Sequence, residues 1–317
     1  MIDPYGRNIT YLRLSVTELC DLRCRYCMPA EGVCKKRHED MLTEDEMVGA
    51  VRAAARLGIT KVRVTGGEPL VKPNILSICR RVSHVPGIRE TVLTTNALRL
   101  KDMAVQLREA GVKRVNISLD TLNPDKYAYI TRRGRLEDAL EGIRAALSAG
   151  FEKVKINAVL IGGFNDGEVP ALAELTRAWP VDVRFIELMP MPGSEEFGAE
   201  AYMPCSEVPK KLPEAVPEDK HDGVARLYRL PGALGSVGLI SPLSSHFCAE
   251  CNRIRLTADG HLKPCLHSAE EISIRGLDED GVLEAMKKAI AMKPRQHGAL
   301  SAKEKSFSAR EMNRVGG

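Results

Sequence analysis

Six short segments that alternate with helical patterns dominate the first two thirds of this 317-residue chain. The segments are residues 11–17, 61–66, 91–96, 114–120, 153–160 and 182–188. The helical patterns include residues 43–58, 101–111 and 136–150, and each of these ends in a glycine, a common helix cap. Because strands that alternate with helices form parallel βαβ units, the sequence predicts an α/β fold on a parallel sheet.

These strands carry a polar residue at every second position, although parallel strands are usually apolar on both faces. On the first strand, Arg13 alternates with Leu12 and Leu14. Side chains alternate across a strand, so one face packs against helices and the other is polar. A sheet curled with its helices outside would enclose Arg13, Arg63 and Lys155. An ordinary open sheet with charges at the strand ends is the alternative.

An enclosed face with several cations predicts an anion-binding site, because buried cations without a partner are costly. A polyphosphate would supply the missing negative charge, and arginine binds phosphate oxygens in pairs. In barrel-like folds of this kind, the chemistry gathers at the carboxyl ends of the strands. Cys20 follows the first strand at that end.

Cys20, Cys24 and Cys27 form a first group of three thiols. Three thiolates can hold a metal and leave one position open. In a four-iron cluster, a missing fourth cysteine leaves one iron free to bind a small molecule. The alternative is a zinc site completed by Cys34 or His38, although zinc sites usually pair their ligands differently.

Cys248, Cys251 and Cys265 form a second group of three. The segment between Cys251 and Cys265 contains an Asp-Gly pair and predicts a β-hairpin that folds Cys265 back toward the other two. A zinc ribbon with His246 or His267 as fourth ligand is one interpretation, and a second iron–sulfur cluster is the other.

Two arginines beside the second group favour the cluster. Arg253 and Arg255 alternate along the predicted strand, so both point to one face next to the cysteines. A phosphate ligand needs such a pair, whereas a structural zinc site does not.

Composition indicates a cytoplasmic globular protein. Hydrophobic residues make up 44% and the formal net charge is +4, which indicates no particular partner. The chain starts without a signal peptide and contains no run of about 18 apolar residues. Nine cysteines in a reducing compartment predict metal ligands and free thiols. The free thiols are expected at Cys34, Cys79 and Cys205.

The first cysteine group, in the segment CDLRCRYC, resembles the motif of the radical S-adenosylmethionine superfamily, with the aromatic Tyr26 before its third cysteine. The resemblance implies that S-adenosylmethionine binds the open iron and is cleaved by one electron to methionine and a 5′-deoxyadenosyl radical. The segment TGGEP at residues 65–69 agrees with it, because two glycines let the backbone approach a ligand closely.

The resemblance narrows to one family and runs nearly end to end. The chain looks like the molybdenum cofactor biosynthesis protein A family, also called GTP 3′,8-cyclase. The shared stretches include LRLSVTELCDLRCRYCMP, KVRVTGGEPLV, NISLDTLNPDKY, VKINAVLIGGFND and CNRIRLTADGHLKPCL. The family implies a partial (β/α)6 TIM-type barrel at residues 1–215. A smaller C-terminal domain at residues 216–317 would carry the second cluster and the Gly-Gly tail.

The resemblance also implies residue roles. Two [4Fe–4S] clusters would be held by Cys20, Cys24 and Cys27 and by Cys248, Cys251 and Cys265. The S-adenosylmethionine contacts would be Tyr26, Gly67, Ser118 and Met189. The GTP contacts would be Arg13, Arg63, Thr94, Lys155, Arg253, Ile254 and Arg255. The catalytic residues would be Arg13, Arg253, Arg255, Gly316 and Gly317.

The implied reaction converts GTP to (8S)-3′,8-cyclo-7,8-dihydroguanosine 5′-triphosphate, the first step of molybdenum cofactor biosynthesis. The radical would remove the ribose 3′ hydrogen, and the carbon radical would attack guanine carbon 8. The second cluster would bind the guanine edge. The implied partners are GTP, a second copy of the chain, an electron-donor protein and the cyclic pyranopterin monophosphate synthase that uses the product. No nucleic-acid or membrane partner is expected.

Four positions depart from the family pattern. Glu18 and Leu19 stand where many members carry Asp-Arg, Ala97 stands where glycine is common, and Val315 where isoleucine is usual. None removes a ligand, but the change at Glu18 touches the approach to the first cluster.

Two alternatives remain at this stage. One is a radical enzyme of another branch, which modifies a peptide and holds auxiliary clusters. The other is a zinc-stabilised binding protein, which metal content would distinguish. A basic segment at residues 131–135 is predicted to be a solvated loop rather than an RNA contact, because no aromatic residues interleave with it.

Overall fold

The computed structural model describes residues 1–34, 36–194, 196–298, 300–301, 304 and 306–316. All six expected strands are present, and neighbouring ones are parallel. They are β1 (Tyr11–Ser15), β2 (Lys61–Thr65), β3 (Glu90–Thr95), β4 (Val112–Ser118), β5 (Lys153–Leu160) and β6 (Val181–Glu187). The prediction of a parallel α/β fold is therefore confirmed.

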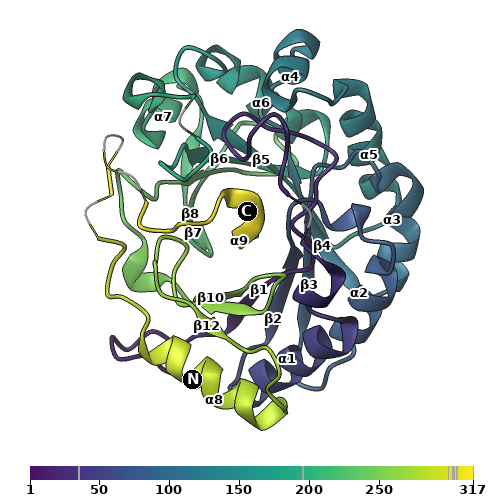
Figure 1. The fold of residues 1–317 in the computed structure, drawn as a ribbon. Helices are drawn as coiled ribbons and strands as arrows, with labels where there is room; N and C mark the ends of the chain where they lie inside the picture. The colour runs from purple at the N-terminus through teal and green to yellow at the C-terminus, as the bar shows by residue number, and fades with distance from the viewer. Residues whose placement is uncertain (35, 195, 299, 302–303, 305, 317) are drawn as a thin grey trace.

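Helices cover the outer face of this sheet, as Figure 1 shows. They are α1 (Glu44–Arg56), α2 (Ile75–Ser83), α3 (Leu100–Glu109), α4 (Pro124–Thr131), α5 (Leu136–Ser148), α6 (Val169–Ala178) and the short α7 (Val208–Lys211). Helix α1 begins with a capping box in which Thr43 and Glu46 each satisfy the other's backbone N–H. The three predicted helix-ending glycines, Gly58, Gly111 and Gly150, all have positive φ, the conformation that a helix cap of this kind requires.

The C-terminal strands extend the same sheet at both edges. They are β7 (Val216–Asp222), β8 (Ala225–Arg229), β9 (Val237–Ile240), β10 (Arg253–Leu256), β11 (His261–Lys263) and β12 (Ile272–Ser273). The strand order is β12-β11-β10-β1-β2-β3-β4-β5-β6-β9-β8-β7. The expected hairpin of the second cysteine group is present as the antiparallel pair β10 and β11. Strand β10 lies parallel to β1, so this hairpin joins the barrel directly.

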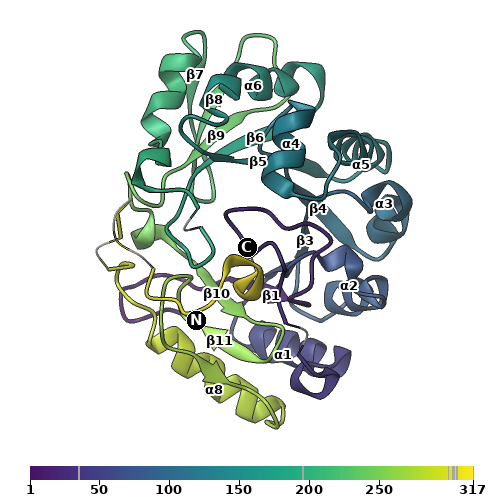
Figure 2. The ribbon, with the colours of Figure 1, turned by 45° about the horizontal axis from the view of Figure 1, so that its top comes forward.

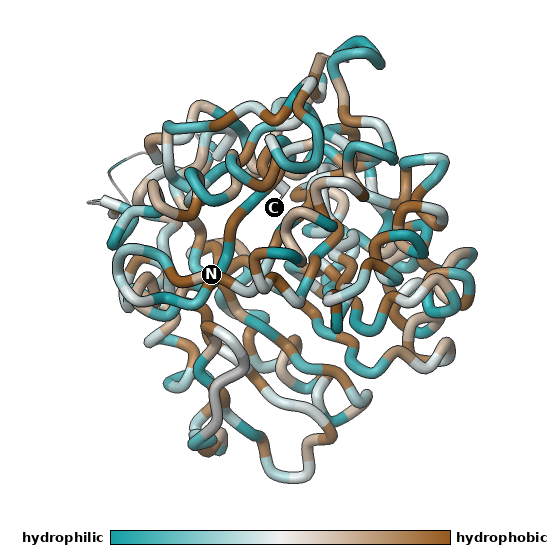
Figure 3. The backbone as a smooth tube through the Cα atoms, turned by 90° about the horizontal axis from the view of Figure 1, so that it is seen from below, coloured by the Kyte–Doolittle hydropathy of each residue, from teal (hydrophilic) through white to brown (hydrophobic). Residues whose placement is uncertain are grey.

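The two faces of the sheet differ as the alternation predicts. The apolar side chains of the strands and the inner sides of the helices form one buried cluster. Arg13, Lys155 and Arg255 belong to the opposite, inner face and are also buried. Figure 3 shows hydrophilic and hydrophobic residues interspersed along the backbone. The polar face is enclosed, and the alternative of an ordinary open sheet is wrong.

The C-terminus lies inside the curled sheet. Helix α8 (Glu279–Ala291) packs outside, next to α1, whereas the short α9 (Met312–Val315) lies in the middle of the barrel (Figures 1 and 2). In the described part of the chain, no helix combines the length and apolar character that a membrane crossing requires.

Candidate functional site

The first cysteine loop is fastened to the end of helix α4. The backbone N–H groups of Arg23 and Arg25 donate to the carbonyls of Thr131 and Ile130, both at 3.0 Å. Arg132 Nη1 donates to the Arg23 carbonyl at 2.9 Å. Arg132 is half-buried and has a left-handed backbone, with φ at 62°. The expectation of a solvated loop at residues 131–135 is therefore wrong for Arg132, which holds the cysteine loop.

The three thiols of this loop lie near enough to affect one another's ionisation. All nine cysteines of the chain are free thiols, and Cys20, Cys24 and Cys27 are half-buried. Burial raises the pKa of Cys24 well above its usual value, and the neighbouring Cys27 and Cys20 raise it further. Burial likewise raises the pKa of Cys27 to about 12. Three thiols that oppose each other's ionisation become thiolates once a cationic group sits among them, because metal ligation requires the deprotonated form.

The TGGEP segment lies against the residues that lead into Cys20. The backbone N–H of Gly67 donates to the Thr17 carbonyl at 2.8 Å, and that of Glu68 to the Leu19 carbonyl at 2.8 Å. A Cβ atom on Gly67 would lie 2.4 Å from the Leu19 carbonyl oxygen. Only glycine permits this close approach to the neighbouring backbone, whereas the expected close approach to a ligand stays a prediction.

We expect Gly67→Ala to weaken S-adenosylmethionine binding at least tenfold and to destabilise the fold by about 1–3 kcal/mol, because the new methyl group overlaps backbone. Urea unfolding and equilibrium binding of S-adenosylmethionine to the iron-loaded protein measure the two effects. Gly167→Ala is the matched control, since nothing lies within 4 Å of its added Cβ. Equal stability and affinity in both variants would refute a role for this close approach.

The other expected S-adenosylmethionine contacts also lie near the carboxyl ends of the strands. Ser118 ends β4, and Met189 comes two residues after β6. The Tyr26 hydroxyl donates to Asp120 Oδ2 at 2.7 Å. Burial raises the pKa of Asp120 to about 6. Asp120 was not anticipated, although its place directly after the fourth predicted strand was a usable signal.

The second cysteine group has a more positive environment than the first. Burial alone would raise the pKa of Cys251, but the positive charges of Arg253 and Lys293 lower it to about 6. The electrostatic attraction of Cys265 acts to raise the pKa of both Arg253 and Arg255. The hairpin thus brings the arginine pair next to these thiols, as predicted.

Neither group is arranged for one small ion. Among the described residues, no three His, Cys, Asp or Glu side chains are placed so that they could hold a single metal ion. A four-iron cluster spans a larger volume than one ion and separates its cysteines more widely. Three free thiols in each of two half-buried loops match the donor set that such a cluster takes from a protein when one iron stays open.

A row of cations crosses the inner face of the sheet. Arg13 on β1 lies at the same register as Arg255 on β10 and Arg63 on β2. Burial, together with Arg255 and Arg63, lowers the pKa of Arg13 well below its usual value. Arg63 Nη1 lies 3.5 Å from Thr94 Oγ1, so Thr94 belongs to the same region. Crowded buried cations favour a polyanion as their partner.

A second row lies next to the first. Tyr11 is at the same register as Arg253 and Lys61. Its buried hydroxyl has no hydrogen-bond partner among the described residues, although such groups nearly always have one. The alternation that puts Arg13 on the polar face puts Tyr11 there too, but sequence reasoning gave Tyr11 no role. Ile254, between the two arginines, points into the apolar core, so only its backbone can contact a ligand.

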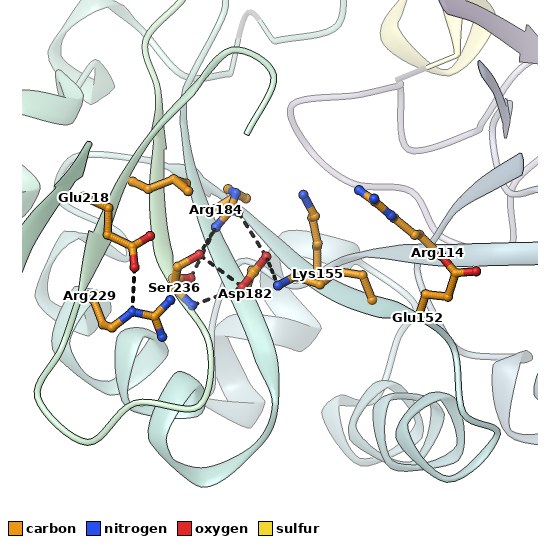
Figure 4. A pocket seen from close by; sticks show the side chains of 10 residues that line it. Arg114, Glu152, Lys155, Asp182, Arg184, Glu218, Arg229 and Ser236 are labelled. Carbon is orange, nitrogen blue, oxygen red and sulfur yellow. Dashed lines mark hydrogen bonds and ion pairs between the residues drawn. The ribbon is translucent and has the colours of Figure 1, made fainter. Parts of the chain in front are cut away.

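A pocket of about 350 Å³ lies near the amino ends of β4, β5 and β6, and Figure 4 shows the side chains that line it. Its lining residues are Arg114, Glu152, Lys153, Lys155, Asp182, Arg184, Glu218, Leu227, Arg229 and Ser236. Burial lowers the pKa of Lys155 to about 6, and the neighbouring Arg184 lowers it further while Asp182 opposes this. The cationic lining suits the end of a polyphosphate chain.

The C-terminal tail runs between the first cysteine group and the arginine row. The Gly316 carbonyl accepts from Arg13 Nη2 at 2.9 Å and from Arg255 Nη1 at 2.8 Å. At the other end, the backbone of Asn313 forms a hydrogen bond with Cys27 that opposes the rise in its pKa. Gly317 lies outside the described residues. The tail therefore contacts both the first cysteine group and the arginine row.

The structure shows the surroundings of two residues that depart from the family pattern, Glu18 and Ala97. The Glu18 carboxylate is buried and pairs with Lys36 Nζ at 3.0 Å, and its oxygens lie 3.8 Å from Arg310 and Arg314 of the tail. Ala97 has φ at 70°, the conformation that explains why glycine suits this position. Glu18 therefore links the approach to the first cysteine group with the tail.

Comparisons with known proteins agree over the whole chain. A family model described as the radical SAM superfamily matches residues 14–176, and one described as Molybdenum Cofactor Synthesis C matches residues 181–299. A protein of Alkaliphilus oremlandii named GTP 3′,8-cyclase is 48% identical over 323 residues, covering 100% of both chains. One of the same name from Moorella thermoacetica is 47% identical over 94% of this chain and 95% of its own.

A solved structure shows the likeness in fold. The crystal structure of SuiB from Streptococcus suis matches with a TM-score of 0.64 at 14% identity, over 86% of this chain and 65% of SuiB. At this identity the comparison supports the architecture alone.

Proposed function

The chain belongs to the GTP 3′,8-cyclase family of the radical S-adenosylmethionine superfamily, and on that premise we propose how its residues divide the work. The enzyme catalyses the first step of molybdenum cofactor biosynthesis, and it uses S-adenosylmethionine and [4Fe–4S] clusters. The observation that supports the residue assignment is the C-terminal tail, which contacts both Cys27 of the first cysteine group and Arg13 and Arg255 of the arginine row. Membership of the family sets aside a peptide-modifying enzyme and a zinc-stabilised binding protein.

The carboxyl end of the barrel would hold the radical source. Cys20, Cys24 and Cys27 would ligate the first cluster. Tyr26, Gly67, Ser118 and Met189 would line the S-adenosylmethionine site, and Asp120 would orient Tyr26 through its hydrogen bond. When bound, the cluster and S-adenosylmethionine supply the radical that takes the ribose 3′ hydrogen. The chain's own part is to hold the cofactor still and to exclude water from the cavity.

The inner face would hold GTP. Cys248, Cys251 and Cys265 would ligate the second cluster beside the guanine end. The phosphate and ribose contacts would be Arg13, Arg63, Thr94, Lys155, Arg253, the backbone of Ile254, and Arg255. The unpartnered hydroxyl of Tyr11 would donate to a phosphate oxygen, and the pocket at Lys155 and Arg184 would receive the end of the triphosphate.

One experiment tests the assignment of the substrate and of the attacked position. The iron-loaded protein is mixed without oxygen with reductant, S-adenosylmethionine and GTP deuterated at ribose carbon 3′. One deuterium in the 5′-deoxyadenosine, measured by mass spectrometry, is the expected result. Undeuterated 5′-deoxyadenosine, formed equally without GTP, would refute GTP as the substrate while leaving the radical chemistry in place.

We expect GTP binding to take up a proton at Lys155. Its pKa of about 6 leaves it mostly neutral at pH 7, and a triphosphate stabilises the charged form and raises the pKa in the complex. Affinity should therefore fall about tenfold per pH unit above pH 6, until the raised pKa is reached. Calorimetry in two buffers of different ionisation enthalpy measures the uptake.

Lys155→Arg is the control for this proton uptake, because arginine stays charged at every relevant pH. The difference in proton uptake between the two proteins isolates Lys155 from the ionisation of GTP itself. Identical uptake in both would show that Lys155 does not contact the triphosphate.

The remaining assignments extend beyond the site. We propose a homodimer, an electron-donor protein as reductant, and transfer of the product to cyclic pyranopterin monophosphate synthase, all in the reducing cytoplasm. The catalytic residues would be Arg13, Arg253, Arg255 and the tail glycines Gly316 and Gly317. We keep a division at residues 1–215 and 216–317, with the second cluster in the latter, although one sheet joins both parts.

A further inference from the structure

Lys293 is a buried cation that the assignments above do not use. It follows helix α8 and is 3% exposed. Its ammonium donates to Cys251 Sγ at 3.5 Å, to the Arg253 carbonyl at 2.9 Å and to the Pro264 carbonyl at 3.0 Å. A lysine ammonium has three N–H donors, so these bonds use all of them. Among the described residues, the acceptor that can carry negative charge is the thiol of Cys251.

These bonds join the two segments that carry cysteines of the second group. The Arg253 carbonyl begins the strand after Cys251, and Pro264 directly precedes Cys265. A bridge between the two segments therefore sets the separation of Cys251 and Cys265.

The backbone around Lys293 is itself held in place. Arg7 Nη1 donates to the Cys248 carbonyl at 2.8 Å, and Arg7 Nη2 donates to the Pro294 carbonyl at 2.7 Å. The Arg7 guanidinium is in turn paired with Asp3. Two buried cations thus connect all three segments that carry cysteines of the second group, and Lys293 is the one that reaches a sulfur.

The electrostatic consequence follows from the burial. An ammonium out of water is costly unless an anion lies beside it, and a thiolate at Cys251 is that anion. The reduction potential of an iron–sulfur cluster depends on its net charge, on its burial and on hydrogen bonds to its sulfurs. A fixed positive charge that donates to a ligand sulfur stabilises the reduced, more negative state.

We propose that Lys293 is a positioning residue for the second iron–sulfur cluster, which hydrogen-bonds the Cys251 ligand and raises the reduction potential of that cluster. The inference rests on the proposed function, because it needs a cluster at this group. In the reaction, the positive charge of Lys293 would offset the negative charge of the cluster's thiolates and sulfides. This matters because the substrate that approaches the cluster is itself a polyanion.

Redox titration followed by electron paramagnetic resonance tests this role. The background is the full chain with Cys20, Cys24 and Cys27 all changed to alanine, so that only the second cluster responds. Lys293→Met keeps most of the side chain and removes the charge. We expect the equilibrium constant for reduction to fall at least tenfold, which is about 59 mV for one electron. Lys293→Arg should restore most of the shift.

Lys287→Met is the matched control. Lys287 lies on α8 and forms an exposed ion pair with Glu284, so water screens its charge. It should leave the potential unchanged. A potential in Lys293→Met equal to that of the parent would overturn the inference.

If Lys293→Met does not hold the second cluster, its reduction potential cannot be measured, and the iron content of the variants is compared instead. Failure of Lys293→Met to retain iron, while Lys293→Arg retains it, supports the charge, because methionine fills the same space. If neither variant retained iron, the positive charge of Lys293 would not be what the cluster needs, and the inference would be overturned. The requirement would then be for the shape of the lysine side chain alone. Zinc instead of iron in the parent protein would refute the proposed function itself, and this is measured first.

Discussion

Cys24→Ala should abolish the formation of 5′-deoxyadenosine below detection. Cys24 lies between its two partners in the sequence, and its pKa is raised by burial and by both of them, so it lies near both. Without Cys24 a four-iron cluster would keep only two protein ligands, and the iron that holds S-adenosylmethionine would lose its fixed position. Iron and sulfide analysis, together with mass spectrometry of the nucleoside product, measures the loss.

Two further cysteine variants make this test specific. Cys34→Ala removes an exposed thiol outside either group and should leave iron content and product unchanged. Cys251→Ala should lower the iron content by about half and abolish cyclisation, but it should leave slow cleavage of S-adenosylmethionine without GTP. Normal 5′-deoxyadenosine from Cys24→Ala would contradict the assignment of the first cluster. Loss of cleavage in Cys251→Ala would show that the two groups do not act separately.

Arg13→Met should weaken GTP binding by about 10- to 100-fold. Arg13 stands in the middle of the arginine row, and its Nε and Nη2 atoms already donate to one oxygen, the Gly316 carbonyl. A phosphate oxygen would accept hydrogen bonds from the same two nitrogen atoms of Arg13. Hydrogen bonds to charged groups contribute about 1.5–3 kcal/mol each. Equilibrium binding of GTP and of guanosine to the iron-loaded protein separates the phosphate contribution, because guanosine should bind both proteins alike.

The control for this variant is Arg135→Met. Arg135 is exposed and makes only a distant ion pair with Asp138, at 4.0 Å, so its loss should change GTP affinity less than twofold. S-adenosylmethionine affinity should stay unchanged in both variants. If guanosine binding fell as much as GTP binding in Arg13→Met, Arg13 would act through the fold of the cavity and not through the triphosphate.

The local elements were predictable because their causes are local. The alternation that placed Arg13, Arg63 and Lys155 on one face depends on neighbouring residues of a strand, and the structure has them there. The hairpin between Cys251 and Cys265 depends on one Asp-Gly turn, and it is present. The glycine caps and the close approach at Gly67 follow from the absence of a Cβ atom. Each of these patterns spans fewer than about 20 residues.

The contacts between distant segments were not predictable from these patterns. Arg132 was predicted to lie in a solvated loop. Its side chain instead holds the cysteine loop, which lies more than one hundred positions earlier in the chain. No sequence pattern singled out Lys293, yet its ammonium donates to Cys251. The alternation places Tyr11 on the same face as Arg13, but it does not show that its hydroxyl lies among arginines and lysines. Periodicity assigns a side chain to a face, but it does not say which segment covers that face.

The sequence by itself determined the parallel sheet, the two cysteine groups, the enclosed cations and the family. Only the tertiary structure decided how these parts meet. Pairing of β10 with β1 sets Arg255 beside Arg13 and Arg63, and it joins the second cysteine group to the barrel. Insertion of the tail brings Gly316 onto the same arginines. The physical reason is that strand propensity and turns are set by adjacent residues, whereas edge pairing and the burial of charges depend on segments that are hundreds of residues apart.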